Sequence, residues 1–104
     1  MFEINGEKWY IKFTNIDNPI FIMDNGDWTI GVCDDNTKTI YIADNLKRKR
    51  LKHVLCHEIV HAAMFSYDIK LGYEEEEFVA NLIATYGEEI IEITNKIFKR
   101  LQYL

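Results

Sequence analysis

Cysteine is scarce in this chain of 104 residues, which contains only Cys33 and Cys56. Two cysteines outside any Cys-x-x-Cys pattern build neither a disulfide framework nor a thiolate zinc site. Long apolar runs are also missing, since no stretch approaches the roughly 20 residues that a membrane-spanning helix needs. The first residues lack the basic and apolar regions of a secretion signal. These absences predict a cytoplasmic protein that has no membrane partner.

Positive charge is in the minority, with 12 Lys and Arg residues against 17 Asp and Glu residues and a net charge of −5. This balance argues against broad nucleic-acid binding. Five cations gather between Lys47 and Lys52, where a solvent-exposed face is the simplest interpretation. Docking of an acidic protein or of a nucleic acid through this basic turn stays open as an alternative. Neither charge nor composition fixes the oligomeric state.

The length and the hydrophobic share of 48% predict a single domain over residues 1–104 that buries its own core. Residues 1–43 favour an antiparallel β-sheet of four or five strands. Asn5-Gly6 predicts a tight hairpin turn, and Trp9 and Trp28 are expected in the core. Turn residues separate the expected strands, which are residues 2–5, 8–14, 20–23, 28–32 and 39–43.

Helices follow the strands. Residues 44–67 predict one helix with Asp44 as its N-cap, and residues 74–103 predict two helices separated at Gly87. The last of them, from Glu88 to Tyr103, is amphipathic, and its isoleucines are expected to face the core. The predicted fold class is therefore α+β.

The central helix contains His57-Glu58-Ile59-Val60-His61. Residues four apart lie on one face of a helix, so both imidazoles can hold one Zn²⁺. Glu58 lies about 100° around the helix from His57, in reach of a water beside the metal, which is the geometry of a general base. Between Val54 and Phe65 no other side chain is polar, which indicates a buried segment in which these three groups need partners. The alternative is two buried histidines satisfied by hydrogen bonds, without a metal.

A third ligand must be a carboxylate, because no histidine follows His61. Glu77 is the best candidate, since it shares a helix face with Asn81 and Ala84, and small residues such as Ala84 let two helices approach closely. Asn81 is positioned to bond the outer ring nitrogen of a ligand histidine. Glu74 is the second choice for the third ligand.

Other polar residues near the motif receive weaker assignments. Glu75 and Glu76 are expected to face away from the metal. His53 lies too far along the helix to share a tetrahedral ion with the other two histidines. Four side chains are unranked candidates for stabilising a reaction intermediate, namely His53, Tyr67, Tyr73 and Tyr86.

The two motif helices carry a family resemblance. His57-Glu58-Ile59-Val60-His61 followed by Glu77-Phe78-Val79-Ala80-Asn81 resembles the gluzincin arrangement of thermolysin relatives. It is more closely similar to small phage- and mobile-element-encoded metallopeptidase-like proteins near the ImmA/IrrE family. Thr85-Tyr86-Gly87 stands where that family usually has a Leu-Leu-Met-Pro-like sequence. The resemblance implies a small zincin-like domain and a zinc-dependent peptidase, with one Zn²⁺ on His57, His61 and Glu77.

The resemblance also implies a substrate, a regulatory or repressor protein of a phage or mobile element. An extended peptide is expected to lie as an added strand along residues 39–43. The rival interpretation is a catalytically inactive protein-binding module with a structural or vestigial metal site. Glu58 argues against it, because a structural site needs no general base.

Overall fold

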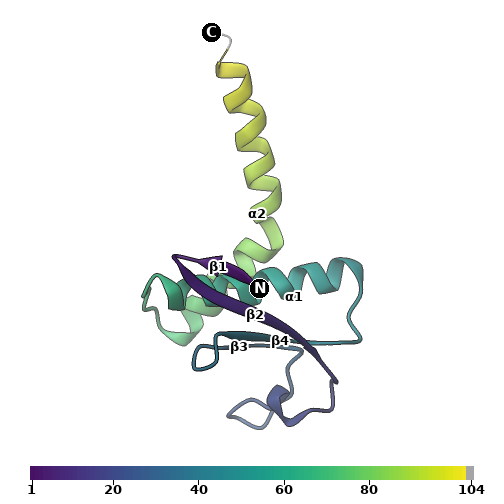
Figure 1. The fold of residues 1–104 in the computed structure, drawn as a ribbon. Coiled ribbons are helices and arrows are strands. Elements are labelled where there is room, and N and C mark those ends of the chain that lie inside the picture. Colours follow the sequence, from purple (N-terminus) through teal and green to yellow (C-terminus); the bar gives the residue numbers. More distant parts are fainter. Residues whose placement is uncertain (103–104) are drawn as a thin grey trace.

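The computed structural model describes residues 1–102, which form a four-stranded sheet followed by two helices (Figure 1). This arrangement confirms the α+β class. Tyr103, the expected end of the last helix, lies outside the described residues. The elements are β1 (Phe2–Ile4), β2 (Glu7–Thr14), the 3-10 helix η1 (Pro19–Phe21), β3 (Gly31–Asp34), β4 (Thr39–Ala43), α1 (Arg48–Ser66) and α2 (Tyr73–Leu101).

The sheet is mixed, with strand order β1-β2-β4-β3. β1 and β3 run antiparallel to their neighbours, whereas β2 and β4 pair in parallel, so the prediction of an antiparallel sheet is wrong. The chain leaves β2, forms β3 at the far edge, and returns through β4 between the two. This long-range pairing has no local signal, because turn residues mark where the chain bends but not which strands meet.

The segment between β2 and β3 accounts for a second correction. Residues 20–23 do not form a strand, because Pro19 opens a 3-10 turn in which the Asn18 side chain accepts a hydrogen bond from the Ile20 amide. Only one bridge, Ile22 to Trp28, remains there, and the next strand begins at Gly31. Trp28 is 56% exposed, so its expected place in the core is also wrong.

The core lies between the sheet and α1. Trp9, Ile40 and Ile42 are fully buried, and they cluster with Val54 and Ala62 of α1. The expected burial of Trp9 is therefore confirmed. These contacts fix α1 on one face of the sheet (Figure 1).

The predicted hairpin turn joins β1 and β2, with positive φ angles of 50° at Asn5 and 78° at Gly6. Such a turn matches the twist of the flanking strands. Asn5 Nδ2 donates to the Ser66 carbonyl at 3.0 Å, and Trp9 Nε1 donates to Ser66 Oγ at 2.7 Å. The hairpin thereby holds the end of α1.

α1 begins at Arg48 rather than after Asp44. The Asp44 amide donates to the Thr14 carbonyl, so the chain is still bound to the sheet where the helix was expected to start. Lys47 is the N-cap residue and provides no side-chain cap. The predicted role of Asp44 is therefore wrong.

α2 is a single helix that continues through Gly87, so the expected division into two helices is wrong. A glycine inside a helix lowers the stability of the helix by only about 1 kcal/mol relative to alanine, and the neighbouring residues offset this cost here. Beyond Glu88 the helix projects away from the sheet and α1 (Figure 1). Its isoleucines are exposed, contrary to the prediction that they face the core. No helix among residues 1–102 is both long and apolar enough to cross a membrane.

Candidate metal centre

His57 and His61 lie one turn apart on α1 and direct their rings into the same space. Their Nε2 atoms are 3.1 Å apart, and His61 is only 7% exposed. A helix produces this spacing whenever two side chains are four residues apart and adopt similar rotamers. The α1 backbone therefore positions two of the three nitrogen and oxygen donors of the site.

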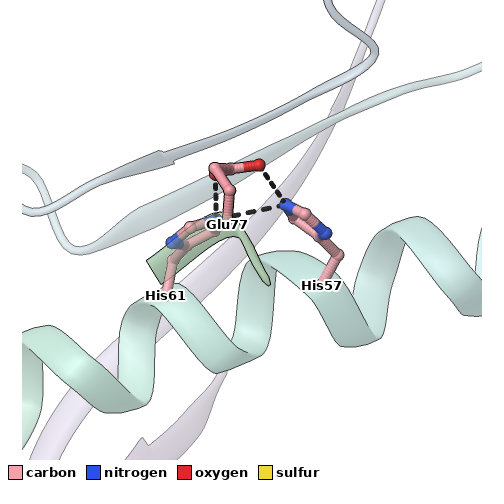
Figure 2. Close-up of side chains that lie close together, drawn as sticks. All are labelled: His57, His61 and Glu77. Carbon is pink, nitrogen blue, oxygen red and sulfur yellow. Dashed lines mark hydrogen bonds and ion pairs between the residues drawn. The ribbon is translucent and has the colours of Figure 1, made fainter. Parts of the chain in front are cut away.

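Glu77, near the start of α2, supplies the third donor. Its Oε1 is 2.8 Å from His61 Nε2 and its Oε2 is 3.2 Å from His57 Nε2, so the carboxylate spans both rings (Figure 2). One donor atom from each residue can be chosen so that all lie within 4.8 Å of one another. Ligands about 2.0–2.2 Å from a tetrahedral zinc are about 3.3 Å from each other, so this donor set fits the ion.

Glu76 also faces the site, and the expectation that it points elsewhere is wrong. Its Oε2 lies 3.2 Å from His61 Nδ1, the nitrogen on the far side of the ring from Glu77. A carboxylate on the outer ring nitrogen fixes the tautomer and orientation of a ligand histidine. Helical spacing alone does not predict this contact. The first turn of α2 crosses α1, and this crossing brings the carboxylates of both Glu76 and Glu77 to the His61 ring.

Burial lowers the pKa of His57, and the Glu77 carboxylate opposes that shift. A side-chain interaction with Asn81 also favours the charged ring, so Asn81 lies beside His57, as helical spacing suggests. The neutral form that burial favours is the form in which an imidazole binds a metal.

The second-choice ligand lies apart from this cluster. Glu74 is exposed and is not among the three residues whose donors converge in the described chain. Glu75 folds back over Gly72 at the helix start, where its carboxylate fills the space beside the glycine Cα. Only two of the four consecutive glutamates therefore reach the histidines.

Glu58 is 7% exposed, and burial raises its pKa to about 7. Its side chain packs over Gly31 of β3, where an added Cβ would lie 3.1 Å from Glu58 Oε2 and 2.9 Å from Val54 Cγ1. Gly31 is a site residue that the sequence did not reveal, because its contribution is the space it leaves. The available signal is a glycine inside the expected strand 28–32.

A cleft of about 540 Å³ opens in front of these groups, and His57, Glu58, His61, Glu76 and Glu77 all line it. Its remaining wall is mainly apolar and includes Ile20, Ile22, Met23, Val32, Cys33 and Phe65. Burial raises the pKa of the Cys33 thiol, which keeps this cysteine protonated and unreactive.

Of the four aromatic or imidazole candidates for stabilising an intermediate, Tyr73 lines the cleft. His53, Tyr67 and Tyr86 are not among the residues of its wall. Tyr73 opens α2 and is 67% exposed, so its ring stands at the rim.

β3 is the strand that borders the cleft, through Gly31, Val32 and Cys33. β3 is also an edge strand, whereas β4 lies between β2 and β3. The expectation that residues 39–43 offer a free edge is therefore wrong, because both sides of β4 are already paired.

Comparison with known proteins gives one match. The family model described as IrrE N-terminal-like domain (Peptidase_M78) matches residues 10–93, well over half of the chain. The matched segment begins within β2 and includes His57, His61 and Glu77. No curated protein and no solved structure matches the chain.

Proposed function

Because the chain belongs to the IrrE N-terminal-like domain family of ImmA/IrrE-type zinc metallopeptidases, we propose that it hydrolyses peptide bonds at the cleft between α1, α2 and β3. The observation that carries this proposal is the convergence of His57, His61 and Glu77 beside the buried carboxylate of Glu58. The donor set and its spacing support Zn²⁺ as the ion. The proposed fold description is zincin-like.

When bound, Zn²⁺ supplies Lewis acidity, which polarises a scissile carbonyl and lowers the pKa of a water toward 7. Glu58 accepts a proton from that water and passes it to the leaving amine. Burial raises the pKa of Glu58 to about 7 in the metal-free chain, and a carboxylate whose pKa lies above its usual range is a better proton acceptor than a free one. Gly31 keeps Glu58 in place by leaving room for its side chain.

The substrate lies in an extended conformation along the free edge of β3. Peptides commonly add a strand to an exposed sheet edge, where main-chain hydrogen bonds provide affinity. The apolar side chains of Ile20, Ile22 and Met23 then accept a large apolar side chain next to the scissile bond. Tyr73, at the rim, is the residue we propose for stabilising the tetrahedral intermediate.

The family resemblance supports a regulatory or repressor protein of a phage or mobile element as the natural substrate. The rival is an inactive module that binds a protein through the same cleft. The two differ in their need for Glu58, since only hydrolysis requires a general base.

The test is digestion of a proteome-derived peptide library by the zinc-loaded protein, with cleavage sites read by mass spectrometry. We expect cleavage beside large apolar residues by the wild type and by Glu74→Gln, a matched control at an exposed glutamate. Glu58→Gln, which keeps the shape of the side chain, should abolish it. Equal cleavage by Glu58→Gln would contradict the mechanism. Zinc binding without cleavage by the wild type would favour the binding module.

A further inference from the structure

The charged side chains that line the cleft are acidic. Four of the lining residues carry carboxylates, namely Asp24, Glu58, Glu76 and Glu77, and none is a lysine or an arginine. A bound Zn²⁺ offsets only two of these negative charges, so the cleft stays negative even when Glu58 holds a proton. A concave wall with one sign of charge concentrates the electric field in the cleft and attracts ligands of the opposite charge.

Asp24 differs from the other three carboxylates in its contacts. Glu76 and Glu77 contact the imidazole of His61, and Glu58 is buried. Asp24 is exposed, and no ion pair within the described chain includes its carboxylate. The charge of Asp24 is therefore available to a ligand in the cleft.

A compact turn fixes Asp24 in the wall. The Met23 amide donates to the Asp27 carbonyl at 2.7 Å, and the Gly26 amide donates to the Met23 carbonyl at 2.8 Å. The residues on either side of this turn form a β-bridge. Residues that recognise a ligand need such support from their surroundings, because a loosely held charge selects poorly.

Apolar side chains lie beside Asp24 in the same wall, those of Ile22 and Met23. Lysine and arginine suit such a surface, because their aliphatic stems pack on apolar side chains while the charged ends reach a carboxylate. We propose that Asp24 is a specificity-determining residue, which selects substrates with a lysine or arginine close to the scissile bond. This inference rests on the proposed peptidase function and adds a second recognised residue to the apolar one.

An extended peptide presents both residues to the same wall. Side chains two positions apart point in the same direction and are separated by about 7 Å along a strand. One of them is the apolar residue of the proposed cleavage site, and the other is the cation that pairs with Asp24. The substrate class is therefore a polypeptide with a basic residue two positions from an apolar one.

Asp27 provides a matched control in the same turn. Its Oδ2 accepts a hydrogen bond from Asn25 Nδ2 at 3.1 Å, and Asp27 is not among the residues of the cleft wall. Asp24→Asn and Asp27→Asn each remove one negative charge and keep the shape of the side chain. The two variants therefore have the same net charge and differ only in where the charge is lost.

The test measures binding separately from cleavage. Labelled synthetic peptides with a central leucine carry lysine or glutamine at each flanking position in turn, and their affinity for zinc-loaded Glu58→Gln is measured by fluorescence anisotropy. At the position that faces Asp24, the lysine peptide should bind about two- to fivefold more tightly than the glutamine peptide, the range of one exposed ion pair. Adding Asp24→Asn should remove this preference, and adding Asp27→Asn should keep it. Adding Asp24→Lys should strengthen binding of the peptide with glutamate at that position.

Three outcomes would contradict the inference. Binding with no preference for lysine at any position, or a preference that survives Asp24→Asn, would overturn it and leave the proposed function intact. An equal loss of preference in Asp24→Asn and Asp27→Asn would overturn it as well, because net charge alone would then explain the effect. If no peptide binds, the proposed function fails and this inference fails with it.

Discussion

Residues 73–88 and residues 89–101, the α2 arm, belong to one unbroken helix, but only the first stretch packs against the rest of the chain. In the first stretch Glu76 and Glu77 contact His61, and Ala80 is fully buried. In the arm, Ile91 and Ile97 are 59% and 52% exposed. The two stretches contain similar shares of apolar residues. Burial therefore depends on whether a partner surface is present. The first stretch has α1 as its partner, whereas no described residue covers the arm.

The largest expected effect is on the rate of peptide cleavage, which should depend on the site at the start of α2 and not on the arm. Glu58→Gln is expected to lower the rate of peptide cleavage about 10²–10⁴-fold, the usual contribution of a general base. Lys96→Ala in the arm should leave the rate unchanged, because Lys96 is exposed and far along α2 from the cleft. Initial rates on one identified peptide, at equal zinc content, give the measurement. A comparable loss of cleavage rate in Lys96→Ala would show that the arm also contributes to cleavage.

Shortening a buried isoleucine should lower the free energy of unfolding more than shortening an exposed one. Ile42→Ala, at a fully buried position, is expected to cost about 2–5 kcal/mol of unfolding free energy through lost contacts and a cavity. Ile97→Ala should change the free energy of unfolding by no more than about 0.5 kcal/mol. Urea unfolding of both variants beside the wild type gives the measurement. An equal cost for the two would show that the arm packs against its own chain.

The pH dependence of the metal-free protein should report on Glu58. Its pKa is raised from 4.5 to about 7 in the folded chain, so ionisation disfavours the folded state. The contribution of Glu58 to the free energy of unfolding is therefore most favourable below pH 4.5 and falls as the pH rises through about 7, by roughly 3 kcal/mol. Unfolding in chelator at pH 5 and pH 8 should show this fall in the wild type and in Glu89→Gln. Glu58→Gln should lose it, and an identical fall in that variant would contradict the assignment.

The smallest expected effect concerns Gly31. Gly31→Ala places a methyl group 3.1 Å from Glu58 Oε2 and 2.9 Å from Val54 Cγ1, which forces one of them to move. We expect a loss of cleavage of about tenfold, the cost of displacing a general base by a fraction of an ångström, with zinc binding retained. Gly87→Ala in α2 is the control, since the added methyl meets only Ile83 of the same helix. Unchanged cleavage in Gly31→Ala would show that Gly31 is not needed to position Glu58.

Local patterns predicted much of this molecule. The hairpin at Asn5-Gly6, the helix around His57 and the family follow from residues close together in the sequence. Helical spacing also named Glu77, which the structure brings within 3.2 Å of both histidines. The hairpin and the helix were predictable because turns and helix faces are set by neighbours within a few residues.

Long-range features were not predictable in the same way. The parallel pairing of β2 with β4 depends on where a distant strand inserts, and no turn signal records it. The contact of Glu76 with His61 depends on the angle at which α2 crosses α1. A glycine at position 87 predicts a helix end, although the residues on both sides keep the helix intact.

The central claim is that His57, His61 and Glu77 hold one zinc ion at the cleft. Its most direct test is zinc content per chain, by mass spectrometry, in wild type, Glu77→Gln and Glu74→Gln after dialysis against a weak chelator. The account predicts about one zinc per chain in the wild type and in Glu74→Gln, and little in Glu77→Gln. Full zinc retention in Glu77→Gln with loss in Glu74→Gln, or no zinc in the wild type, would contradict it.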